Sequence, residues 1–521
     1  MTSKVCILTA GKGSRMGSLG EHLNKALLPL DKRAIISQII ERFPERFDFV
    51  IGIGHKGEQV RNYLELAHPH TNFQFVNIDR FEGPGSGPGY SLLCCKEYLQ
   101  NPFYFVSCDT LWENVVDFTL KEDWMGVAQV QNSEAFCNFK LESGRIIDVK
   151  DKVKVDSQQY QAFTGLCHIW HFEDFFKALE KNDAIDGEHQ ISNGLSALID
   201  LYRPLAVPMT WIDTGNNESY RKAAREYEDF DFAKENEVFY QVNGRIIKFF
   251  SDERISDNRV KRAQLNPSVF PEIDGSRPQF YSYVMAPGKI LYECSTPKLF
   301  ERFLKWLHQN LWKEIPLGSY SMNDKAENFY FSKTNDRLKQ YYKKCGVLDG
   351  ASIVNGVRIP STQSLFEKID WKRLYQSKPV FFHGDLHFDN ALYDRASDRF
   401  TLLDWRQDFA GEIRFGDLYY DLAKLKGGLL LNYDMIKRNL FSYEEQDSVI
   451  ELDFVQRHRS EVYEKILDAF VIEQKLDLYK VNLLVPLIYL NMAPLHHAPF
   501  DRLLYSLGRL HLYENLKYSE V

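Results

Sequence analysis

The sequence contains few cysteines and no regular spacing among them. Its eight cysteines are scattered, Cys94-Cys95 is the only adjacent pair, and no C-x-x-C is present. A disulfide-stapled secreted domain depends on paired cysteines at set spacings, so that class is excluded and reduced thiols are expected.

An excess of positive charge and a long apolar run are also missing. The net charge of −8 argues against a general nucleic-acid binder. The most apolar late stretch, Leu483–Leu490, is far shorter than the ~20 residues of a membrane span. Val5–Leu8, near the start, is too short for a signal-peptide core. We expect a cytoplasmic protein whose partners are small molecules and nucleotides, without nucleic acid or membrane; a homo-oligomer remains open.

The length of 521 residues exceeds one ordinary core, and 44% hydrophobic residues are ample for several. No internal repeat or low-complexity linker divides the chain. The pattern changes at an acidic, aromatic stretch, Tyr227–Phe232. We therefore predict one domain over residues 1–228 and a second over 229–521.

The first 228 residues alternate between strand-like and helix-like segments, which predicts an α/β domain with a largely parallel sheet covered by helices. A later set of strands is expected to be more antiparallel. The expected early strands are Val5–Leu8, Phe49–Ile53, Phe73–Asn77, Phe103–Ser107 and Gly126–Gln129, the early helices Ala34–Arg42 and Gly57–Leu66, and the later strands Asn138–Leu141, Arg145–Val149 and Gly165–Trp170.

The second domain starts with a strong hairpin signal. Two β-like runs, Glu237–Val242 and Arg245–Phe250, flank Asn243-Gly244. A helix over Ser256–Leu265 and a strand over Phe280–Met285 follow, and from Thr296 onward the chain is mostly helical. A small β-rich lobe over residues 229–290 and a larger helical lobe over 291–521 form a kinase-like order.

A phosphate-handling signature follows the first strand. The loop Ala10-Gly11-Lys12-Gly13-Ser14-Arg15 lets backbone N–H groups approach a triphosphate, and Arg15 and Lys25 can neutralise its charge. A lone Gly-x-Gly is usually a tight turn. The strand, the glycines and the two cations in this order favour nucleotide binding through Ala10, Gly11, Gly13 and Ser14, with Arg15 and Lys25 as catalytic cations.

Residues 5–30 resemble the sugar-phosphate nucleotidyltransferases, including their phosphocholine cytidylyltransferase branch. The resemblance implies a Rossmann-like, GT-A type fold, in which a phosphate monoester attacks the α-phosphate of an NTP. It also implies that the glycine-rich loop Gly83–Tyr90 contacts the base, through Gly87 among others. A flexible glycine run alone could be a plain surface loop, so the weight of this prediction comes from the position of the loop in the sequence.

Two aspartates in this region end strand-like segments. Asp109 lies in Ser107-Cys108-Asp109-Thr110 and Asp213 in Trp211-Ile212-Asp213-Thr214. A carboxylate at a strand's C-terminal end faces the ligand crevice in such sheets, and the resemblance implies that the two hold Mg²⁺. It also suggests acceptor-phosphate roles for Lys152 and Glu188, for which an exposed charged face is the alternative.

A second signature lies in the C-terminal half, where His383-Gly384-Asp385 is followed by Asn390 and later by Asp404. The interval of five from Asp to Asn is typical of kinase catalytic loops. Asp385 would orient or accept the proton of a substrate hydroxyl, and Asn390 and Asp404 would hold Mg²⁺ with ATP. Strand pairing over Ala391–Asp394 and Thr401–Leu403 is expected to bring the two metal ligands together.

This segment resembles the aminoglycoside phosphotransferase and choline kinase superfamily, which implies a bilobal protein-kinase-like domain. Lys248 is then the candidate lysine for the ATP phosphates, although the expected Gly-rich loop is missing and the predicted helix Ser256–Leu265 contains no glutamate. Asp421 is expected to bond back to the catalytic loop and His383 to be architectural. His387 either lies near the substrate or is a solvated loop residue, and the second alternative is favoured.

The sequence therefore predicts a bifunctional enzyme that uses ATP, CTP or another NTP, and Mg²⁺ at both sites. It would phosphorylate a small polar metabolite and convert the product to an NDP-activated precursor for surface glycan or capsule decoration. One alternative is a sugar 1-kinase joined to a sugar-1-phosphate nucleotidyltransferase that uses UTP or GTP. Another is a nucleotide-binding regulatory protein with one inactive domain. A choline substrate would favour an aromatic cage, for which Trp405, Tyr419 and Tyr420 are available.

Overall fold

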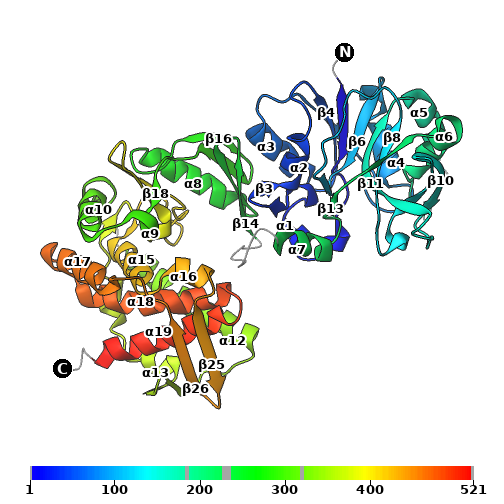
Figure 1. Ribbon diagram of the computed structural model, residues 1–521. Helices are drawn as coiled ribbons and strands as arrows, with labels where there is room; N and C mark the ends of the chain where they lie inside the picture. Colours follow the sequence, from blue (N-terminus) through cyan, green and yellow to red (C-terminus); the bar gives the residue numbers. More distant parts are fainter. Residues whose placement is uncertain (1–2, 182–186, 226–235, 317–321, 518–521) are drawn as a thin grey trace. The chain divides into compact units, whose positions relative to one another are not determined.

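The computed structural model describes residues 3–181, 187–225, 236–316 and 322–517, and their contacts form two compact units (Figure 1). The first unit holds the described residues up to 225 together with residues 236–253 and 275–282. The second holds residues 254–274 and the described residues from 283 onward. The boundary stretch Tyr227–Phe232 lies outside the described residues, so a domain division at residue 228 stays a prediction.

A nine-stranded mixed sheet forms the centre of the first unit, in the order β5-β4-β1-β6-β11-β8-β12-β10-β9. Its first four strands are parallel to one another, and β11 is antiparallel to both of its neighbours β6 and β8. The bounds are β1 Lys4–Leu8, β4 Asp48–Ile53, β5 Phe73–Asn77, β6 Phe103–Ser107, β8 Trp124–Ala128, β9 Cys137–Glu142, β10 Arg145–Asp151, β11 Tyr160–Ile169 and β12 Leu205–Pro208. The predicted early parallel strands and later antiparallel strands are both confirmed.

Helices cover both faces of this sheet (Figure 1). α2 and α3 contribute to a core with one face, while α4, α5 and α6 contribute to a core with the other. In α3 and α5 the apolar residues recur on one side, which is why each buries one face, whereas all six residues of α2 are buried. The bounds are α1 Leu19–His22, α2 Ile35–Ile40, α3 Gly57–Ala67, α4 Pro88–Cys94, α5 Phe172–Leu179, α6 Ser192–Tyr202 and α7 Asn217–Arg225.

Two short strand pairs accompany the main sheet. β2 (Pro29–Leu30) pairs with β3 (Arg33–Ala34), and β7 (Thr110–Trp112) pairs with β13 (Trp211–Asp213). The second pair joins segments a hundred residues apart at the end of β6, where it brings two loops of the sheet edge together.

A separate four-stranded sheet, in the order β14-β15-β17-β16, contains the predicted hairpin. Its strands are β14 Glu237–Val242, β15 Arg245–Phe250, β16 Ile273–Arg277 and β17 Phe280–Val284. Its inner side chains share the core of the first unit: the ring of Tyr240 lies 4.7 Å from that of Tyr63 on α3 and its hydroxyl donates to the carbonyl of Leu27. The backbone N–H of Gln241 also donates to the carbonyl of Lys32 at 2.7 Å. This sheet, which the sequence analysis assigned to the small lobe of the second domain, therefore packs on the helix layer of the first unit.

The second unit is mainly helical, as predicted from Thr296 onward. α18 packs against α15 and α19 at its centre. The helices are α8 Glu253–Leu265, α9 Leu291–Cys294, α10 Pro297–Asn310, α11 Asn323–Glu327, α12 Lys333–Cys345, α13 Thr362–Phe366, α14 Trp371–Tyr375, α15 Leu418–Leu430, α16 Tyr433–Lys437, α17 Ser460–Glu473, α18 Leu478–Met492 and α19 Phe500–Lys517. Because α8 begins at Glu253, the expectation of a glutamate-free helix is wrong.

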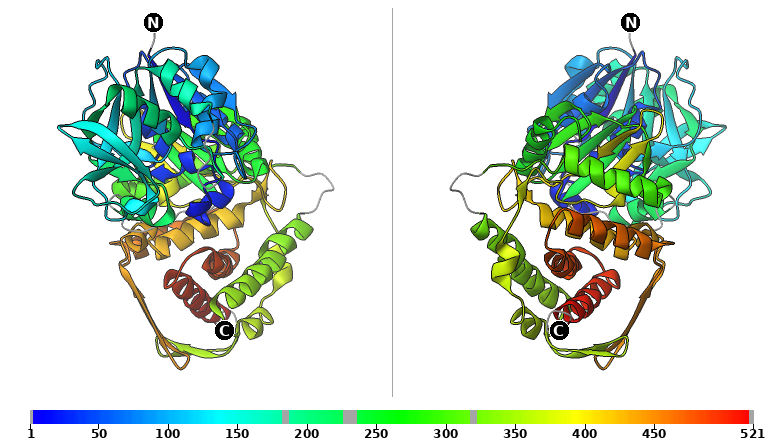
Figure 2. Two further views of the ribbon diagram at one scale, coloured as in Figure 1. Left: turned by 90° about the vertical axis from the view of Figure 1, so that its right-hand side faces the viewer. Right: turned by 90° about the vertical axis from the view of Figure 1, so that its left-hand side faces the viewer.

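Small sheets interrupt the helices of the second unit. β18 (Lys289–Ile290) extends the hairpin β22 (Ala391–Asp394) and β23 (Arg399–Leu402), and β21 (Pro379–Val380) pairs with β24 (Gly416–Asp417). Figure 2 shows the long orange hairpin β25 (Phe441–Gln446) and β26 (Val449–Phe454) beside β19 (Ser352–Val354) and β20 (Val357–Ile359). The first of these hairpins carries the C-terminal motif.

One segment is longer and more apolar than the sequence analysis expects. The window Leu478–Leu495 has a mean hydropathy of 1.3 and could cross a membrane by length and composition alone. However, 61% of it is buried inside the second unit, as in the core helix of a globular protein. This helix is weak evidence for a membrane span.

Candidate active sites

The first site forms where parallel strands of the large sheet end. β1 and β6 are neighbours, with Leu8 opposite Ser107, so the loops that follow them leave the same edge of the sheet. The glycine loop follows β1, and Asp109 follows β6 two residues after its end. In open α/β sheets this edge is where ligands bind.

The glycine loop combines one tight position with one open position. Gly13 has a left-handed conformation (φ 64°), and a Cβ placed there would lie 3.3 Å from the Cβ of Lys25. No atom lies within 4 Å of a Cβ placed on Gly11. The backbone at Gly11 is therefore accessible to a bulky anion, while Gly13 lets the chain turn back over Lys25.

Asp109 and Asp213 converge although 104 positions separate them. In the β7–β13 pair Asp213 lies opposite Thr110, and the backbone N–H of Thr214 donates to the carbonyl of Asp109 at 3.0 Å. A Cβ placed on Gly215 would lie 2.8 Å from Oδ1 of Asp213 and 3.3 Å from Oδ2 of Asp109. The two carboxylates thus share one small volume beside Gly215.

Lys25 extends into this volume from the short turn Lys25–Leu27. Its ammonium donates to Oδ2 of Asp109 and, at 3.1 Å, to the carbonyl of Gly215. Burial opposes the ionisation of both partners. Their charge attraction and hydrogen bond, together with other nearby groups, outweigh burial, so the pKa of Lys25 is raised and that of Asp109 is lowered. Arg15 is exposed and close enough to act electrostatically on both.

Asp213 differs from Asp109 in its electrostatics. Burial, followed by the negative charge of Asp109, raises the pKa of Asp213, against hydrogen bonds from Ser219 at 2.9 Å and from the backbone of Gly215. Two carboxylates that repel each other suit a hard divalent cation, which would relieve that repulsion. No cluster of three or more His, Cys, Asp or Glu side chains with metal-site geometry occurs in the described part of the chain, so a cation here would keep several waters.

The residues predicted for the base and for the acceptor lie on two joined segments. The N–H of Gly85 donates to the carbonyl of Gly187 at 2.7 Å, and that of Gly89 to the carbonyl of His189 at 2.7 Å. A Cβ on Gly87 would lie 2.6 Å from the carbonyl oxygen of His189, so only glycine allows this approach. Lys152 and Glu188 lie 3.7 Å apart as an ion pair. The structure therefore brings these two predicted residues together.

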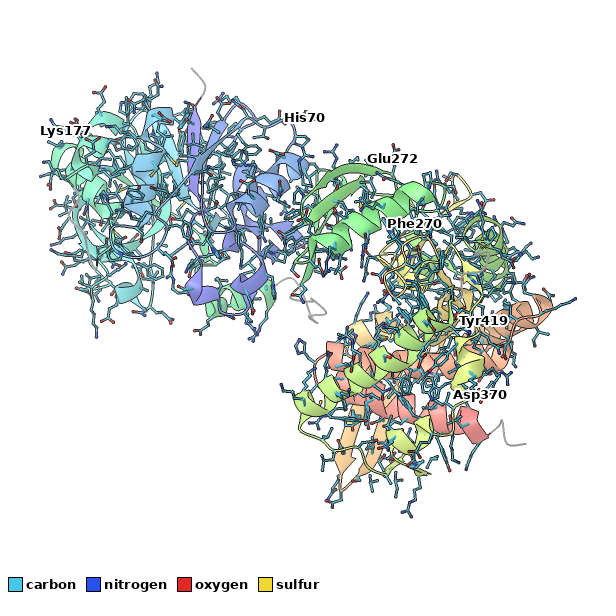
Figure 3. All side chains as sticks on the ribbon, turned by 180° about the vertical axis from the view of Figure 1, so that it is seen from behind. His70, Lys177, Phe270, Glu272, Asp370 and Tyr419 are labelled. Carbon is cyan, nitrogen blue, oxygen red and sulfur yellow. The ribbon has the colours of Figure 1, made fainter. Side chains whose placement is uncertain are left out.

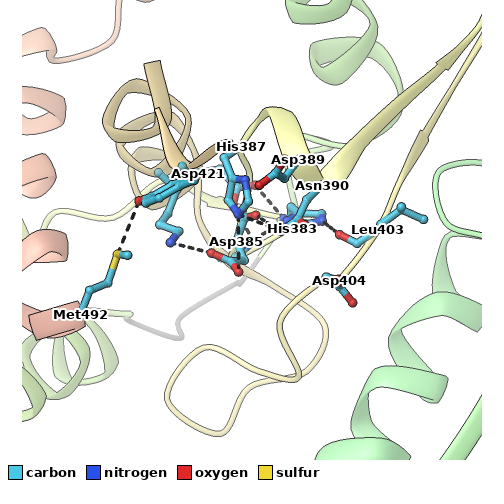
Figure 4. Close-up of polar contacts among 12 residues, drawn as sticks. His383, Asp385, His387, Asp389, Asn390, Leu403, Asp404, Asp421 and Met492 are labelled. Atoms are coloured by element: carbon cyan, nitrogen blue, oxygen red, sulfur yellow. Dashed lines mark hydrogen bonds and ion pairs between the residues drawn. The ribbon is translucent and has the colours of Figure 1, made fainter. Parts of the chain in front are cut away.

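The second site forms at the start of the β22–β23 hairpin (Figure 4). Asn390 immediately precedes β22, and the N–H of Leu403 donates to the carbonyl of Asn390 at 2.8 Å. Asp404 follows Leu403 and has a left-handed backbone conformation (φ 53°). Strand pairing thus places Asn390 beside Leu403, the residue that precedes Asp404, as the sequence predicts. The side-chain amide of Asn390 also donates to the carbonyl of Asp385 at 2.9 Å.

Asp385 is paired with a cation that the sequence analysis missed. The ammonium of Lys424, on α15, lies 2.5 Å from Oδ1 of Asp385. Burial lowers the pKa of Lys424, but the charge of Asp385, the neighbouring Tyr433 and Tyr420 and the hydrogen bond to Asp385 together outweigh that effect, so the net pKa is raised. The sequence contains no clear signal for this role, because α15 carries two buried lysines, Lys424 and Lys426, and only the fold shows which of them contacts Asp385.

Asp421 holds the loop from behind, as expected. Its carboxylate accepts hydrogen bonds from the backbone N–H of His383 at 2.7 Å, from that of Gly384 at 2.6 Å and from the indole of Trp312 at 3.0 Å. Burial raises its pKa to about 6. The imidazole of His383 is bonded to the carbonyl of Leu403 at 2.7 Å, and burial lowers its pKa to about 3, so an architectural role fits.

His387 is not the solvated residue that the sequence suggested. Its side chain is only 13% exposed, and its Nε2 lies 3.1 Å from the amide nitrogen of Asn390 and 4.0 Å from Oδ2 of Asp385. Burial lowers its pKa, so the ring is neutral and contributes to the lining of the loop. Its aromatic neighbour is Tyr433, with ring centroids 5.1 Å apart.

Two arginines of α8 were also missed. Nη1 of Arg259 lies 3.9 Å from Oδ1 of Asp404. Arg262 is fully buried, lies over the rings of Phe381 and Phe382, and donates to the carbonyl of Phe382. The sequence around Arg259 and Arg262 is that of an ordinary polar helix, so only the fold shows that the two side chains face the catalytic loop.

The aromatic residues proposed for a choline cage have other roles. Trp405 is fully buried, with its indole donating to the carbonyl of Arg259 and its ring 4.5 Å from that of Phe270. The hydroxyl of Tyr419 accepts from the backbone N–H of Asp477 at 3.1 Å. Phe270 and Tyr419 are labelled in Figure 3. Tyr420 lines a pocket together with Phe329 and Tyr330.

Lys248 is buried on β15 with its ammonium 5.0 Å from the ring centroid of Phe239. It belongs to the first compact unit, whereas Asn390 and Asp404 belong to the second. Its role with ATP stays a prediction.

Two family models match the chain. The MobA-like NTP transferase domain matches residues 5–120, and the phosphotransferase enzyme family matches residues 298–442. These spans contain the glycine loop with Lys25 and Asp109, and the second motif from His383 to Asp421. They confirm the two resemblances that the sequence analysis states.

Curated relatives resemble only the first part. The bifunctional protein GlmU of Methanocaldococcus jannaschii is 25% identical over 216 residues, and that of Methanococcus vannielii 23% identical over 218 residues. Each alignment covers 40% of this chain, and 50% and 51% of the relative, respectively. The chain thus spans about half the length of the curated relatives it matches.

Similar solved structures also match less than half of this chain. A putative glucose-1-phosphate thymidylyltransferase from Bacillus anthracis matches at 19% identity with a TM-score of 0.38, covering 45% of this chain and 98% of that one. A UDP-glucose pyrophosphorylase complexed with UDP-glucose matches at 18% identity with a TM-score of 0.37, covering 44% and 98%. The mixed α/β chain thus contains an N-terminal region that matches the MobA-like NTP transferase domain and a C-terminal region that matches the phosphotransferase enzyme family.

Proposed function

We propose that the two domains catalyse consecutive steps on one metabolite. The kinase half, bilobal and protein-kinase-like, transfers the γ-phosphate of ATP to a hydroxyl. The transferase half, Rossmann-like and of the GT-A type, then joins the resulting phosphate monoester to an NMP unit. The observation that carries this proposal is the presence of both constellations in one chain: Asp109 with Asp213 and Lys25, and Asp385 with Asn390 and Asp404.

In the first step Asp385 accepts the proton of the acceptor hydroxyl as its oxygen bonds to the γ-phosphorus. The bond from that phosphorus to the β,γ-bridging oxygen breaks, and ADP leaves with the electron pair. Lys424, 2.5 Å from Asp385, orients the carboxylate toward the acceptor hydroxyl. Asn390 and Asp404 are the residues that would hold Mg²⁺, which supplies charge neutralisation at the phosphates. Lys248 would contact the ATP phosphates.

In the second step an oxygen of the new phosphate monoester bonds to the α-phosphorus of an NTP, and pyrophosphate leaves. The acceptor is already an anion, so alignment and charge stabilisation suffice. The backbone of Ala10, Gly11, Gly13 and Ser14 would cradle the triphosphate, Gly87 would contact the base, and Arg15 with Lys25 would stabilise the leaving group. Asp109 and Asp213 would hold Mg²⁺, and Lys152 with Glu188 would contact the acceptor.

The chemistry supports an activated precursor as product, because the product of the first reaction is the acceptor that the second requires. We propose CTP as the NTP and surface glycan or capsule decoration as the destination, in the cytoplasm. An anomeric sugar kinase that feeds a sugar-1-phosphate nucleotidyltransferase with UTP or GTP has the same logic.

The test uses the purified full chain with Mg²⁺ and ATP and a panel of alcohols, polyols and sugars, followed by CTP, UTP or GTP. We expect ADP first, then pyrophosphate and a nucleotide conjugate detected by mass spectrometry. Nucleotide binding without turnover of any acceptor would favour the regulatory alternative.

A further inference from the structure

A pocket beside the proposed phosphorylation site combines aromatic rings with positive charge. It is lined by Phe329, Tyr330, Lys333, Tyr420, Leu484 and Asn491. Phe329 and Tyr330 lie in the turn Asn328–Ser332, and Lys333 begins α12. All of these residues belong to the second unit.

Two cations of the protein already occupy the ring at the centre of this pocket. The ammonium of Lys333 lies 4.0 Å from the ring centroid of Phe329, and the guanidinium carbon of Arg406 lies 5.0 Å from the same centroid. Phe329 also stacks on Phe409 at 4.3 Å and contacts Tyr420 edge-on at 4.9 Å. A quaternary ammonium group needs open aromatic faces, so this arrangement disfavours a cationic metabolite.

One of the two cations, Arg406, is linked directly to the catalytic loop. The backbone N–H of Arg406 donates to the carbonyl of His383 at 2.9 Å, and a Cβ placed on Gly384 would lie 2.5 Å from the Cβ of Arg406. Tyr420 lines the pocket one helical turn before Lys424, which contacts Asp385. An anion bound to Arg406 would therefore lie beside the loop that carries Asp385, the carboxylate proposed to receive the hydroxyl proton.

The local charge is not balanced by the protein. Among the residues that the structure describes, no carboxylate forms an ion pair with Lys333 or Arg406, and the side chain of Arg406 donates to the backbone carbonyl of Asp408. Burial, then the positive charges of Arg406, Arg337 and Lys424, lower the pKa of Lys333 well below its usual value; Asp408 opposes them only partly. A bound anion would relieve this repulsion.

We propose that the metabolite phosphorylated at Asp385 carries an anionic group, a carboxylate or a phosphate, which binds Lys333 and Arg406. This inference rests on the proposed kinase function. The acceptor class is then a hydroxy acid or a phosphorylated polyol rather than choline. Its hydroxyl oxygen bonds to the γ-phosphorus of ATP while its proton passes to Asp385.

The experiment measures phosphoryl transfer by the full chain to acceptors of matched size and different charge. The probes are glycerate, glycerol 3-phosphate, glycerol and choline, with larger sugar acids and sugar phosphates as a second set. We expect kcat/KM for anionic acceptors to exceed that for neutral ones by about tenfold or more. Glycerate and glycerol 3-phosphate separate a carboxylate site from a phosphate site.

Variants then locate the anion. Lys333→Met should raise KM for the anionic acceptor about tenfold and leave KM for ATP unchanged, while Lys339→Met, at an exposed position of the same helix, should change neither. A raised KM for ATP with an unchanged acceptor preference would place Lys333 on the ATP phosphates and overturn the proposal. Preference for choline over every anion would also overturn it.

A binding measurement separates failure of this inference from failure of the kinase assignment. Thermal unfolding of the full chain is followed with the same anions in the absence of ATP. Stabilisation by an anion that is lost in Lys333→Met supports the site even if no phosphoryl transfer is found. If transfer proceeds with neutral acceptors and no anion stabilises the chain, the kinase stands and the anionic site is refuted.

Discussion

The two candidate sites use carboxylates at strand ends but hold them in different ways. In the first, Lys25 bonds directly to Asp109, one of the proposed metal ligands, and the loops of the sheet edge position the rest. In the second, Lys424 bonds to the proposed base Asp385, and the buried carboxylate of Asp421 fixes the loop through two backbone N–H groups. Activity at the first site should therefore depend on the residues that contact its substrates, whereas activity at the second should also depend on Asp421, which lies behind the loop.

The largest effect is expected from Asp385→Asn. Loss of the proton acceptor should lower kcat for phosphoryl transfer by about 10²–10⁴-fold and leave nucleotidyl transfer from a supplied phosphate monoester unchanged. ADP release and pyrophosphate release are measured separately on the same preparation. Asp394→Asn, a turn carboxylate of the neighbouring hairpin, serves as the control. An Asp385→Asn enzyme with normal phosphoryl transfer would refute the assignment of the base.

Asp109→Asn should produce the complementary loss. Removing one charge from the pair with Asp213, and the partner of Lys25, should lower nucleotidyl transfer by about 10²–10³-fold while ADP formation continues. The Mg²⁺ concentration that the variant needs for nucleotidyl transfer should also rise. Asp117→Asn, at an exposed position bonded to Thr119, is the matched control. If Asp109→Asn also stops ADP formation, the two sites are not independent.

A smaller effect, confined to the second site, is expected from Asp421→Asn. Because the folded-state pKa of Asp421 is raised to about 6 above an ordinary value near 4, its ionisation destabilises the fold as pH rises through that window. Relative to the parent, the variant should gain about 2 kcal/mol in the free energy of unfolding between pH 4 and pH 7. Phosphoryl transfer should still fall by about 10-fold or more as the loop loosens.

Urea unfolding at several pH values and the two rate assays check this prediction together. Asp336→Asn, an exposed residue on α12, should show neither change. A variant whose stability follows the same pH curve as the parent would show that Asp421 does not titrate in this window.

The smallest effect is expected at the acceptor pair of the first site. Lys152→Gln should raise KM for the phosphate acceptor a few-fold, to about 10-fold, with little change in kcat or stability, because its ion pair with Glu188 is half exposed. The neighbouring Lys150→Gln, whose ion pair with Asp148 is also exposed, is the control. Equal effects of both changes would mean that Lys152 is only part of a charged face.

The sequence was sufficient for the regular strands and for both motifs. Alternating apolar runs located β1, β4, β5 and β6 to within a residue, and Asn243-Gly244 located the β14–β15 hairpin. It could not show how Asp109 meets Asp213, because that contact depends on the three-residue strands β7 and β13, which are too short to leave a periodic pattern. Lys424 was missed because an amphipathic lysine in a helix has no distinctive spacing.

The sequence also could not predict which core the β14–β15 sheet packs against. Its apolar side chains are equally compatible with either neighbouring core, and only the tertiary structure shows Tyr240 against Tyr63. The start of α8 was also missed: the helix begins at Glu253, three residues before the predicted Ser256, because helix ends are poorly defined by sequence pattern.

The placement of that sheet has an evolutionary consequence. A premature stop after residue 228 would remove Tyr240, Ile247 and Phe280 from the core that they share with Tyr63. Each aromatic ring of this kind is worth about 3–5 kcal/mol when truncated to alanine. Losing the downstream reading frame would thus endanger the upstream catalyst as well, so selection on either activity tends to preserve the fused gene.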